Sequence, residues 1–218
     1  SDPSSTRAAP PLSGSGGAAL VLLGSETGVG TEGALIQCSQ AEAELGASVA
    51  GAGDVNGDGF DDVIVGAPRY DAGQTDEGAA FVFLGSATGI ASGSEAIAAA
   101  RLEADQSGSG SQGDLPAYLG TSVAGAGDVN GDGYGDVIVG APGYDAGLAD
   151  EGAAFVFLGS AAGIAHGNPA TAHARFESDQ GGISLLDRWP FLGRSVASAG
   201  DVDGDGYDDV IVGAPSYN

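Results

Sequence analysis

Residues 119–142 read LGTSVAGAGDVNGDGYGDVIVGAP, and this stretch decides the fold because the chain repeats it three times. Residues 45–91 align without gaps on residues 119–165, and 40 of the 47 aligned residues are identical. A third copy begins at residue 192 as LGRSVASAGDVDGDGYDDVIVGAP. Repetition at a fixed period of this length is typical of proteins built as an array or a ring of equal units.

The repeat is split between the two ends of the chain. The third copy contains only a front half, whereas residues 17–36 read GAALVLLGSETGVGTEGALI and match GAAFVFLGSATGI from the back half of the whole copies. We therefore divide the chain into a Ser-, Pro- and Gly-rich linker (1–16), a back half (17–44), two whole repeats (45–118 and 119–191) and a front half (192–218). Together these pieces amount to three units.

Each unit contains about four short β-type segments. In the first whole repeat they are residues 48–53, 63–65, 79–84 and, more weakly, 97–104. Gly-Asp, Asn-Gly and Ala-Pro pairs separate them, and these pairs make turns and break helices. No segment shows an apolar period of 3.6 residues over ten or more residues. The sequence therefore predicts an all-β fold of propeller type, in which complementary half repeats at the two ends are the usual way to close a ring.

Composition excludes several classes of partner. Six arginines and lysines face 30 aspartates and glutamates, for a formal charge of −24. Such a chain cannot neutralise phosphates, so we expect no nucleic-acid partner and no docking on anionic lipid. No apolar run is long enough for a transmembrane helix, so we expect no membrane insertion. The single cysteine excludes an internal disulfide framework and a cysteine-based zinc site.

The most specific chemistry lies in a nonapeptide that occurs once in each unit. We call its copies loop 1 (54–62, DVNGDGFDD), loop 2 (128–136, DVNGDGYGD) and loop 3 (201–209, DVDGDGYDD). Oxygen-bearing side chains stand at positions 1, 3, 5 and 9, with glycine at positions 4 and 6. Calcium prefers six to eight oxygen ligands, and a turn rich in glycine lets odd-numbered side chains converge. The pattern predicts one calcium ion in each loop.

Two alternatives to this interpretation are an EF-hand and an ion-free turn. An EF-hand requires a glutamate at its twelfth position, where Val65 stands after Asp54, and it requires a following helix instead of a strand. An ion-free Asx-type turn would explain one loop. It explains less well why three loops keep positions 1, 3, 5 and 9 while position 8 varies between aspartate and glycine.

The repeat resembles the FG-GAP repeat of the integrin α-subunit β-propeller and its bacterial relatives. Its Phe-Gly element corresponds to Tyr118-Leu119-Gly120 and Phe191-Leu192-Gly193, with a departure at Glu44-Leu45-Gly46. The Gly-Ala-Pro element occurs as residues 66–68, 140–142 and 213–215. The resemblance covers nearly all of residues 17–217 and implies four-stranded blades, with calcium held between the first two strands of a blade.

The resemblance also implies which residues bind the ions, with the position-7 residue binding through its backbone carbonyl. The expected ligands are Asp54, Asn56, Asp58, Phe60 and Asp62 in loop 1, Asp128, Asn130, Asp132, Tyr134 and Asp136 in loop 2, and Asp201, Asp203, Asp205, Tyr207 and Asp209 in loop 3.

The number of units departs from the family, whose propellers usually close with seven blades. Three units cannot close a ring alone. The chain is therefore either a segment of a longer propeller or a subunit that associates with other chains. Two chains would supply six blades, with each front half completed by the back half of the other, whereas joining without closure would give a filament. Blade edges left unpaired would be an aggregation hazard.

An enzymatic function is not expected. The sequence has no Ser/His/Asp arrangement, no G-x-S-x-G and no phosphate loop with a lysine. We interpret His166 and His173 as surface or filler residues, with His173 at the repeat position of Cys38 and Ala99. The pairs Asp76-Glu77 and Asp150-Glu151 are interpreted as solvated turn charges, or alternatively as outer ligands or an acidic rim.

Several features carry no assigned role. Two long insertions, residues 105–118 and 179–191, distinguish the whole repeats from the N-terminal half repeat. Trp189 in the second insertion is expected to pack against its own blade, with an interface anchor as the alternative. Cys38 is expected to be a small buried side chain.

The sequence thus predicts a non-enzymatic, calcium-binding extracellular propeller module for adhesion, protein–protein interaction or scaffolding, on a secreted or cell-surface and bacterial protein. Its partners would be other protein chains, including copies of itself, or a surface protein or glycan. The alternatives are a subunit that polymerises through split blades and an accessory propeller of a larger hydrolase or carbohydrate-binding protein.

Overall fold

The computed structural model describes residues 15–107, 115–179 and 190–217, and in these residues the chain is all-β apart from one short 3₁₀ turn. The elements are β1 (Ala18–Ser25), β2 (Gly28–Gln37), β3 (Ser48–Gly53), β4 (Asp62–Ala67), β5 (Ala79–Phe83), β6 (Gly93–Ser94), η1 (Glu95–Ile97), β7 (Ala100–Glu103), β8 (Ser122–Gly127), β9 (Asp136–Ala141), β10 (Ala153–Phe157), β11 (Ala174–Glu177), β12 (Ser195–Gly200) and β13 (Asp209–Gly213). The described residues contain no helix that is long and apolar enough to cross a membrane.

Two four-stranded antiparallel sheets confirm the predicted fold class. One has the order β3-β4-β5-β7 and the other the same order, β8-β9-β10-β11. We call each sheet a blade and number its strands one to four from β3 and β8. The fourth strand is shorter than the sequence suggested, because η1 occupies the start of the predicted 97–104 segment and β7 begins only at Ala100.

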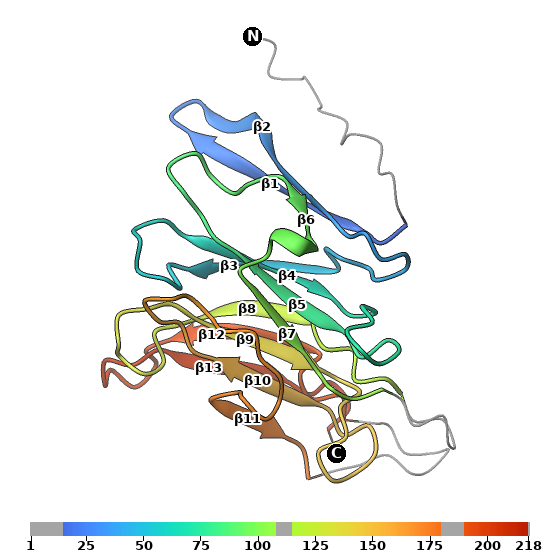
Figure 1. Ribbon diagram of the computed structural model, residues 1–218. Helices are drawn as coiled ribbons and strands as arrows, with labels where there is room; N and C mark the ends of the chain where they lie inside the picture. The colour runs from blue at the N-terminus through green and yellow to red at the C-terminus, as the bar shows by residue number, and fades with distance from the viewer. Residues whose placement is uncertain (1–14, 108–114, 180–189, 218) are drawn as a thin grey trace.

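The two remaining hairpins have the registers of half blades. Ala19 lies opposite Ile36 in the β1–β2 hairpin, as Ala80 lies opposite Leu102 between strands three and four of the first blade. The β12–β13 hairpin repeats the register of strands one and two, including the irregularity before the second strand. Figure 1 shows the β1–β2 hairpin at one end of the stack of sheets.

This register corrects one alignment made from the sequence. Gln37 pairs with Ala18, and Glu103 pairs with Ala79, so Cys38 corresponds to Ala104 and not to Ala99 or His173. The error arose because the β1–β2 hairpin is shorter than the β5–β7 segment by five residues, 19 from Ala18 to Gln37 against 24 from Ala79 to Glu103, and lacks its 3₁₀ turn. Cys38 is buried and unpaired with another cysteine, as expected.

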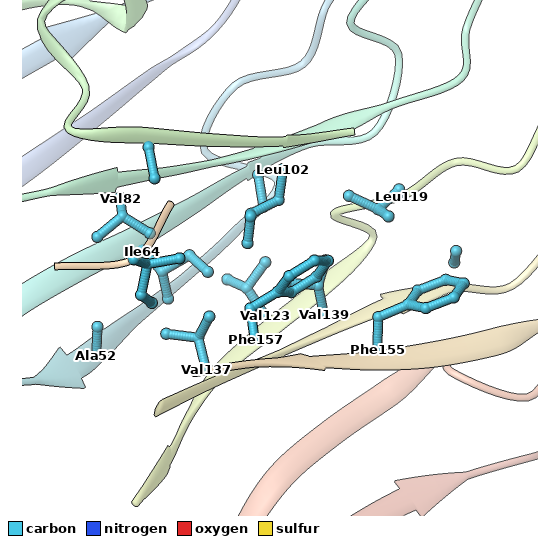
Figure 2. Close-up of a cluster of buried hydrophobic side chains, with 14 of the residues drawn as sticks. Ala52, Ile64, Val82, Leu102, Leu119, Val123, Val137, Val139, Phe155 and Phe157 are labelled. Atoms are coloured by element: carbon cyan, nitrogen blue, oxygen red, sulfur yellow. The ribbon is translucent and has the colours of Figure 1, made fainter. Parts of the chain in front are cut away.

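Apolar side chains fill the spaces between neighbouring sheets. The largest cluster joins the two blades, and Figure 2 shows Ile64 and Leu102 of the first blade facing Val137 and Phe155 of the second. Every second residue of strands two and three faces this space, and the residues between them pack on the opposite face of the blade, because successive side chains alternate across a strand. The inner strands β3, β8 and β12 lie next to one another along the row of blades.

Each blade also reaches back to the blade before it. Its connection between strands three and four forms a parallel bridge to the preceding outer strand, with Gly93 beside Ile36 and Gly167 beside Leu102. The residue before each glycine then accepts a backbone hydrogen bond. Ser92 Oγ accepts from the Leu35 N–H at 3.1 Å, and His166 Nδ1 accepts from the Arg101 N–H at 3.0 Å.

A glutamine adds a second contact between blades. The Gln40 amide donates to the Asp71 carbonyl at 3.1 Å and accepts from the Asp71 N–H at 2.6 Å. Gln106 repeats both bonds with Asp145 at 3.0 and 2.6 Å. Paired bonds to the N–H and C=O of one residue fix the distance between consecutive blades.

We predict that His166→Ala costs about 1 kcal/mol of unfolding free energy, because the Arg101 N–H loses its acceptor. His166→Ser should restore most of the loss, since Ser92 serves the same purpose one blade earlier. Urea denaturation of both variants measures the difference. Equal stability of the alanine and serine variants would contradict a hydrogen-bonding role.

Candidate cation-binding loops

The three aspartate loops occupy equivalent places in the fold. Each joins strand one to strand two: loop 1 lies between β3 and β4, loop 2 between β8 and β9, and loop 3 between β12 and β13. The glycines at positions 4 and 6 have positive φ angles in all three, for example 72° at Gly57 and 88° at Gly59. Glycine adopts this backbone conformation without a steric penalty, so the loop can turn tightly around its own side chains.

The first aspartate organises the loop. Asp54 Oδ1 accepts the N–H groups of Gly57 and Asp58 at 2.7 and 3.1 Å, and Oδ2 accepts that of Gly59 at 2.8 Å. These backbone donors, Gly59 first, hold the pKa of Asp54 below its ordinary value. Asp201 makes all three corresponding bonds in loop 3, and Asp128 makes those from positions 5 and 6 in loop 2.

Positions 3 and 5 lie beside each other. In loop 1, Asn56 Oδ1 accepts from the Asp58 N–H at 3.1 Å, and the Asn56 amide donates to Asp58 Oδ2 at 3.0 Å. Asp58 Oδ1 accepts from the Phe60 N–H at 3.0 Å. Loop 2 repeats these three bonds through Asn130, Asp132 and Tyr134. In loop 3 an aspartate, Asp203, stands in place of this asparagine, so all four of positions 1, 3, 5 and 9 carry carboxylates.

The ninth position is buried in loops 1 and 2. Asp62 Oδ2 accepts the Val55 N–H at 2.8 Å and Oδ1 accepts the Gly85 N–H at 2.7 Å, so this carboxylate ties the loop to the end of strand three. Asp136 does the same with Val129 and Gly159 at 2.9 and 2.8 Å. Burial raises the pKa of both carboxyl groups, and the aspartates at positions 5 and 1 raise it further.

Loop 3 differs in its ninth position. Asp209 Oδ2 accepts the Val202 N–H at 2.9 Å, but Asp209 is only partly buried. One oxygen each of Asp201, Asp203 and Asp209 lies within 4.8 Å of the others. Three carboxylates at this separation repel one another unless a cation or protons compensate them. This set of hard oxygen donors suits a divalent cation such as calcium, and so do the homologous sets in loops 1 and 2.

Aromatic rings connect consecutive loops, a contact that was not anticipated from the sequence. A methyl group added at Gly57 would lie 2.7 Å from the Tyr134 ring, and one at Gly131 would lie 2.7 Å from the Tyr207 ring. The rings of Tyr134 and Tyr207 therefore cover the position-4 glycine of the preceding loop. The available signal was that all three position-7 residues are aromatic while position 8 varies.

The paired acids after strand two were interpreted wrongly as solvated turn charges. Glu77, Asp150 and Glu151 are buried. Glu77 Oε1 accepts the N–H groups of Ala72 and Gln74 at 3.1 and 2.8 Å. The carboxylate therefore holds together the loop that precedes strand three. Burial is the main cause that raises the pKa of Glu77. Trp189 and part of both long insertions lie outside the described residues.

Comparison with known proteins matches the repeat in three places and relates about three quarters of the chain to one group of proteins. A model of the FG-GAP repeat matches residues 45–83, 119–157 and 192–218. Integrin alpha-PS5 of Drosophila melanogaster is 33% identical over 169 residues, which cover 74% of this chain and 14% of that protein. Integrin alpha-4 of Xenopus laevis is 34% identical over 171 residues, covering 78% and 14%. Integrin alpha pat-2 of Caenorhabditis briggsae is 38% identical over 174 residues, covering 74% and 12%. The chain therefore spans about one seventh of the length of these relatives.

Proposed function

The chain is an FG-GAP repeat protein related to integrin alpha subunits, and from this premise we propose that it is a calcium-binding β-propeller module for protein interaction. In this proposal the module is non-enzymatic and serves adhesion or scaffolding. The observation that carries the proposal is the threefold occurrence of one loop geometry, with carboxylates of loop 3 converging within 4.8 Å. The relatives and the acidic loops support divalent cation binding by the module.

Calcium would be held by the side chains at positions 1, 3, 5 and 9 and by the position-7 carbonyl. In loop 3 these are Asp201, Asp203, Asp205, Asp209 and the carbonyl of Tyr207. The ion would supply positive charge where several carboxylates crowd together, and it would fix the hairpin between strands one and two. Since most backbone N–H groups of the loops already donate to aspartates of the same loop, the ion would rigidify a formed turn and not create it.

The proposed site of action is outside the cell, on a secreted or surface protein of a bacterium. Calcium sites of extracellular modules have dissociation constants of about 10⁻⁴ to 10⁻³ M, which suits millimolar calcium. The near identity of the repeats and the absence of lysine favour a bacterial surface protein over an animal receptor. The ligand would be a surface protein or a glycan.

We expect calcium to raise the melting temperature by about 10 °C over that in excess chelator. Free calcium at ten times the dissociation constant stabilises the fold by about 1.4 kcal/mol per site, or about 4 kcal/mol for three sites. In a domain of this size 1 kcal/mol shifts the midpoint by about 2–4 °C. Differential scanning calorimetry with calcium, magnesium or chelator measures the shift. Identical curves in calcium and in chelator would refute the metal assignment.

A second candidate function is structural, with the chain as a subunit that assembles through its half blades into a ring or a filament. The observation that favours it is Ile211 in β13, which is 60% exposed, whereas the equivalent Ile64 and Ile138 are 0% exposed. The mass in solution at millimolar calcium separates the two assemblies from an isolated chain.

A further inference from the structure

Consecutive aspartate loops are bonded to each other. The Gly135 N–H, at position 8 of loop 2, donates to the Asp54 carbonyl of loop 1 at 2.8 Å. The Asp208 N–H, at position 8 of loop 3, donates to the Asp128 carbonyl of loop 2 at 3.1 Å. Loops 1 and 2 are therefore each held at their first residue, the aspartate that organises the loop, by the loop that follows in the chain.

The ring at position 7 spans the same junction. In the proposed cation site of loop 2 the carbonyl of Tyr134 is a ligand, whereas its ring lies against Gly57 of loop 1. Tyr207 of loop 3 stands in the same relation to Gly131 of loop 2. One residue thus belongs to two loops, through its backbone in its own loop and through its ring in the preceding one.

The end of strand three in the second blade also joins loops 1 and 2. The Gly159 N–H donates to Asp136 Oδ1, at position 9 of loop 2, at 2.8 Å. The next N–H, that of Ser160, donates to the Val55 carbonyl in loop 1 at 3.1 Å. The Val55 N–H donates to Asp62 Oδ2, at position 9 of loop 1, at 2.8 Å. A continuous series of hydrogen bonds therefore connects the two position-9 carboxylates.

Close packing leaves little freedom at this junction. Val55 is 0% exposed and packs in the apolar cluster that contains Val137 and Phe157 of the second blade. A methyl group at Gly159 would lie 2.3 Å from the carbonyl oxygen of Gly135 in loop 2 and 2.8 Å from that of Val55 in loop 1. Since these neighbours are backbone atoms, a shift of loop 2 is passed on to loop 1.

We propose that loops 1 and 2 form one cation-binding unit, in which an ion in loop 2 raises the affinity of loop 1 by fixing Tyr134 over Gly57. This inference rests on the calcium function proposed above and describes how its sites regulate each other. An ion held by the Tyr134 carbonyl would restrict this residue and with it the ring on loop 1. The next ion then enters a loop whose cover is already ordered, so less conformational entropy is lost on binding. By linkage, an ion in loop 1 raises the affinity of loop 2 by the same factor.

Charge acts in the opposite direction. Loop 2 contains three aspartates, and a calcium ion cancels two of their three negative charges. A less negative neighbour attracts cations more weakly, which lowers the affinity of loop 1. Salt screens this opposing contribution but leaves the contact through Tyr134 in place. We therefore expect the coupling between the two loops to grow as the salt concentration is raised.

A reporter for loop 1 makes the coupling measurable. Phe60→Trp places an indole at position 7 of loop 1, where the ring is exposed, and a Trp189→Phe background removes the only native tryptophan. Terbium shares the preference of calcium for oxygen ligands and emits when an excited indole lies close to it. Titration with terbium, followed by displacement with calcium, gives the affinity of loop 1. Asp58→Ala removes the position-5 carboxylate of loop 1 and should abolish the signal.

Two position-5 substitutions form a matched pair in the reporter protein. Asp132→Ala disables loop 2, which contacts loop 1, and Asp205→Ala disables loop 3, which follows loop 2. We expect Asp132→Ala to weaken binding in loop 1 about fivefold or more, and Asp205→Ala to change it by about twofold at most. Charge alone predicts the opposite sign for Asp132→Ala, because loop 2 without its ion is more negative than loop 2 with it.

Substitution of the ring separates coupling from a general loosening of loop 2. Tyr134→Ala removes the ring but keeps the carbonyl, whereas Tyr134→Phe keeps both, as phenylalanine does at position 7 of loop 1. In the alanine background, Asp132→Ala should no longer weaken loop 1. In the phenylalanine background, Asp132→Ala should weaken loop 1 as much as it does with tyrosine present. This double-mutant cycle isolates the contribution of the ring.

The possible results distinguish this inference from the function on which it rests. A reporter protein that binds terbium equally well with and without Asp132→Ala would overturn the coupling and leave independent cation sites. Equal weakening by Asp132→Ala and Asp205→Ala would also overturn it, because the effect would then not depend on contact between the loops. A reporter protein that is folded by circular dichroism but gives no terbium signal would overturn cation binding by loop 1, and the coupling with it.

Discussion

Gly140→Ala is expected to lower the unfolding free energy by about 3 kcal/mol or more, which is the upper end of the cost of overpacking. A methyl group at Gly140 would lie 1.8 Å from the carbonyl oxygen of Gly193, in the inner region of the next blade. Gly66 stands in the same relation to Gly120, at 2.0 Å. Since the obstacle is backbone and not a flexible side chain, the two blades must move apart, and the apolar layer between them loosens.

Gly73→Ala is the control for this substitution. A methyl group there meets only Glu77 Oε1, at an ordinary 3.8 Å, and the residue has no positive φ. Removing a glycine at a compatible position stabilises a protein by about 0.4–1 kcal/mol through the unfolded chain. Chemical denaturation should therefore shift in opposite directions for the two variants. A Gly140 variant as stable as the unmodified protein would show that the blades are not packed through backbone contact.

Asp136→Ala is expected to cost about 3–5 kcal/mol even in the presence of a chelator. The carboxylate is fully buried and accepts two backbone N–H groups, from Val129 and Gly159. Each buried donor left without a partner costs about 1–3 kcal/mol. The aspartate therefore holds loop 2 against the third strand regardless of any ion, and the melting temperature should fall by about 10 °C.

Asp132→Ala separates this structural role from metal binding. Asp132 is exposed and stands at position 5 of the same loop, where its side chain accepts the Tyr134 N–H at 3.0 Å and the Asn130 side-chain amide at 2.9 Å. In chelator it should change the melting temperature little, whereas in calcium both variants should lose the stabilisation due to loop 2. If both variants behave alike in chelator, the buried hydrogen bonds of Asp136 contribute nothing of their own.

The strands and the aspartate loops were predictable from the sequence because their signals are local. β3 was located at both ends, and the Val-Ile-Val run identified the centre of β4. Turn residues and β-branched residues act over a few positions, so they can be recognised wherever they occur. Threefold repetition then favoured a cation-binding interpretation over a chance cluster of aspartates.

The contacts between blades could not be predicted in the same way. Gln40 and Gln106 bond to residues more than thirty positions away, and neither has a local motif. The burial of Glu77 depends on the loop that contains Ala72 and Gln74, whose N–H groups bond to its carboxylate. No periodic pattern in the sequence predicts this fold of the loop. Such interactions arise from the stacking of sheets, and a single sequence records them only as residues that recur at the same place in each repeat.

The backward reach of each blade has a consequence for synthesis on the ribosome. The outer strand of the first blade is covered by Gly167, and the Arg101 N–H is capped by His166, a residue 65 positions later. Chains emerge from the amino terminus at about 5–20 residues per second. The outer edge of the first blade therefore stays uncovered for several seconds, until residues 166 and 167 of the second blade have been synthesised. During this interval nascent chains should be most vulnerable to proteases and to strand pairing with nascent chains on neighbouring ribosomes. Synonymous codons that slow translation between the blades should lengthen the interval.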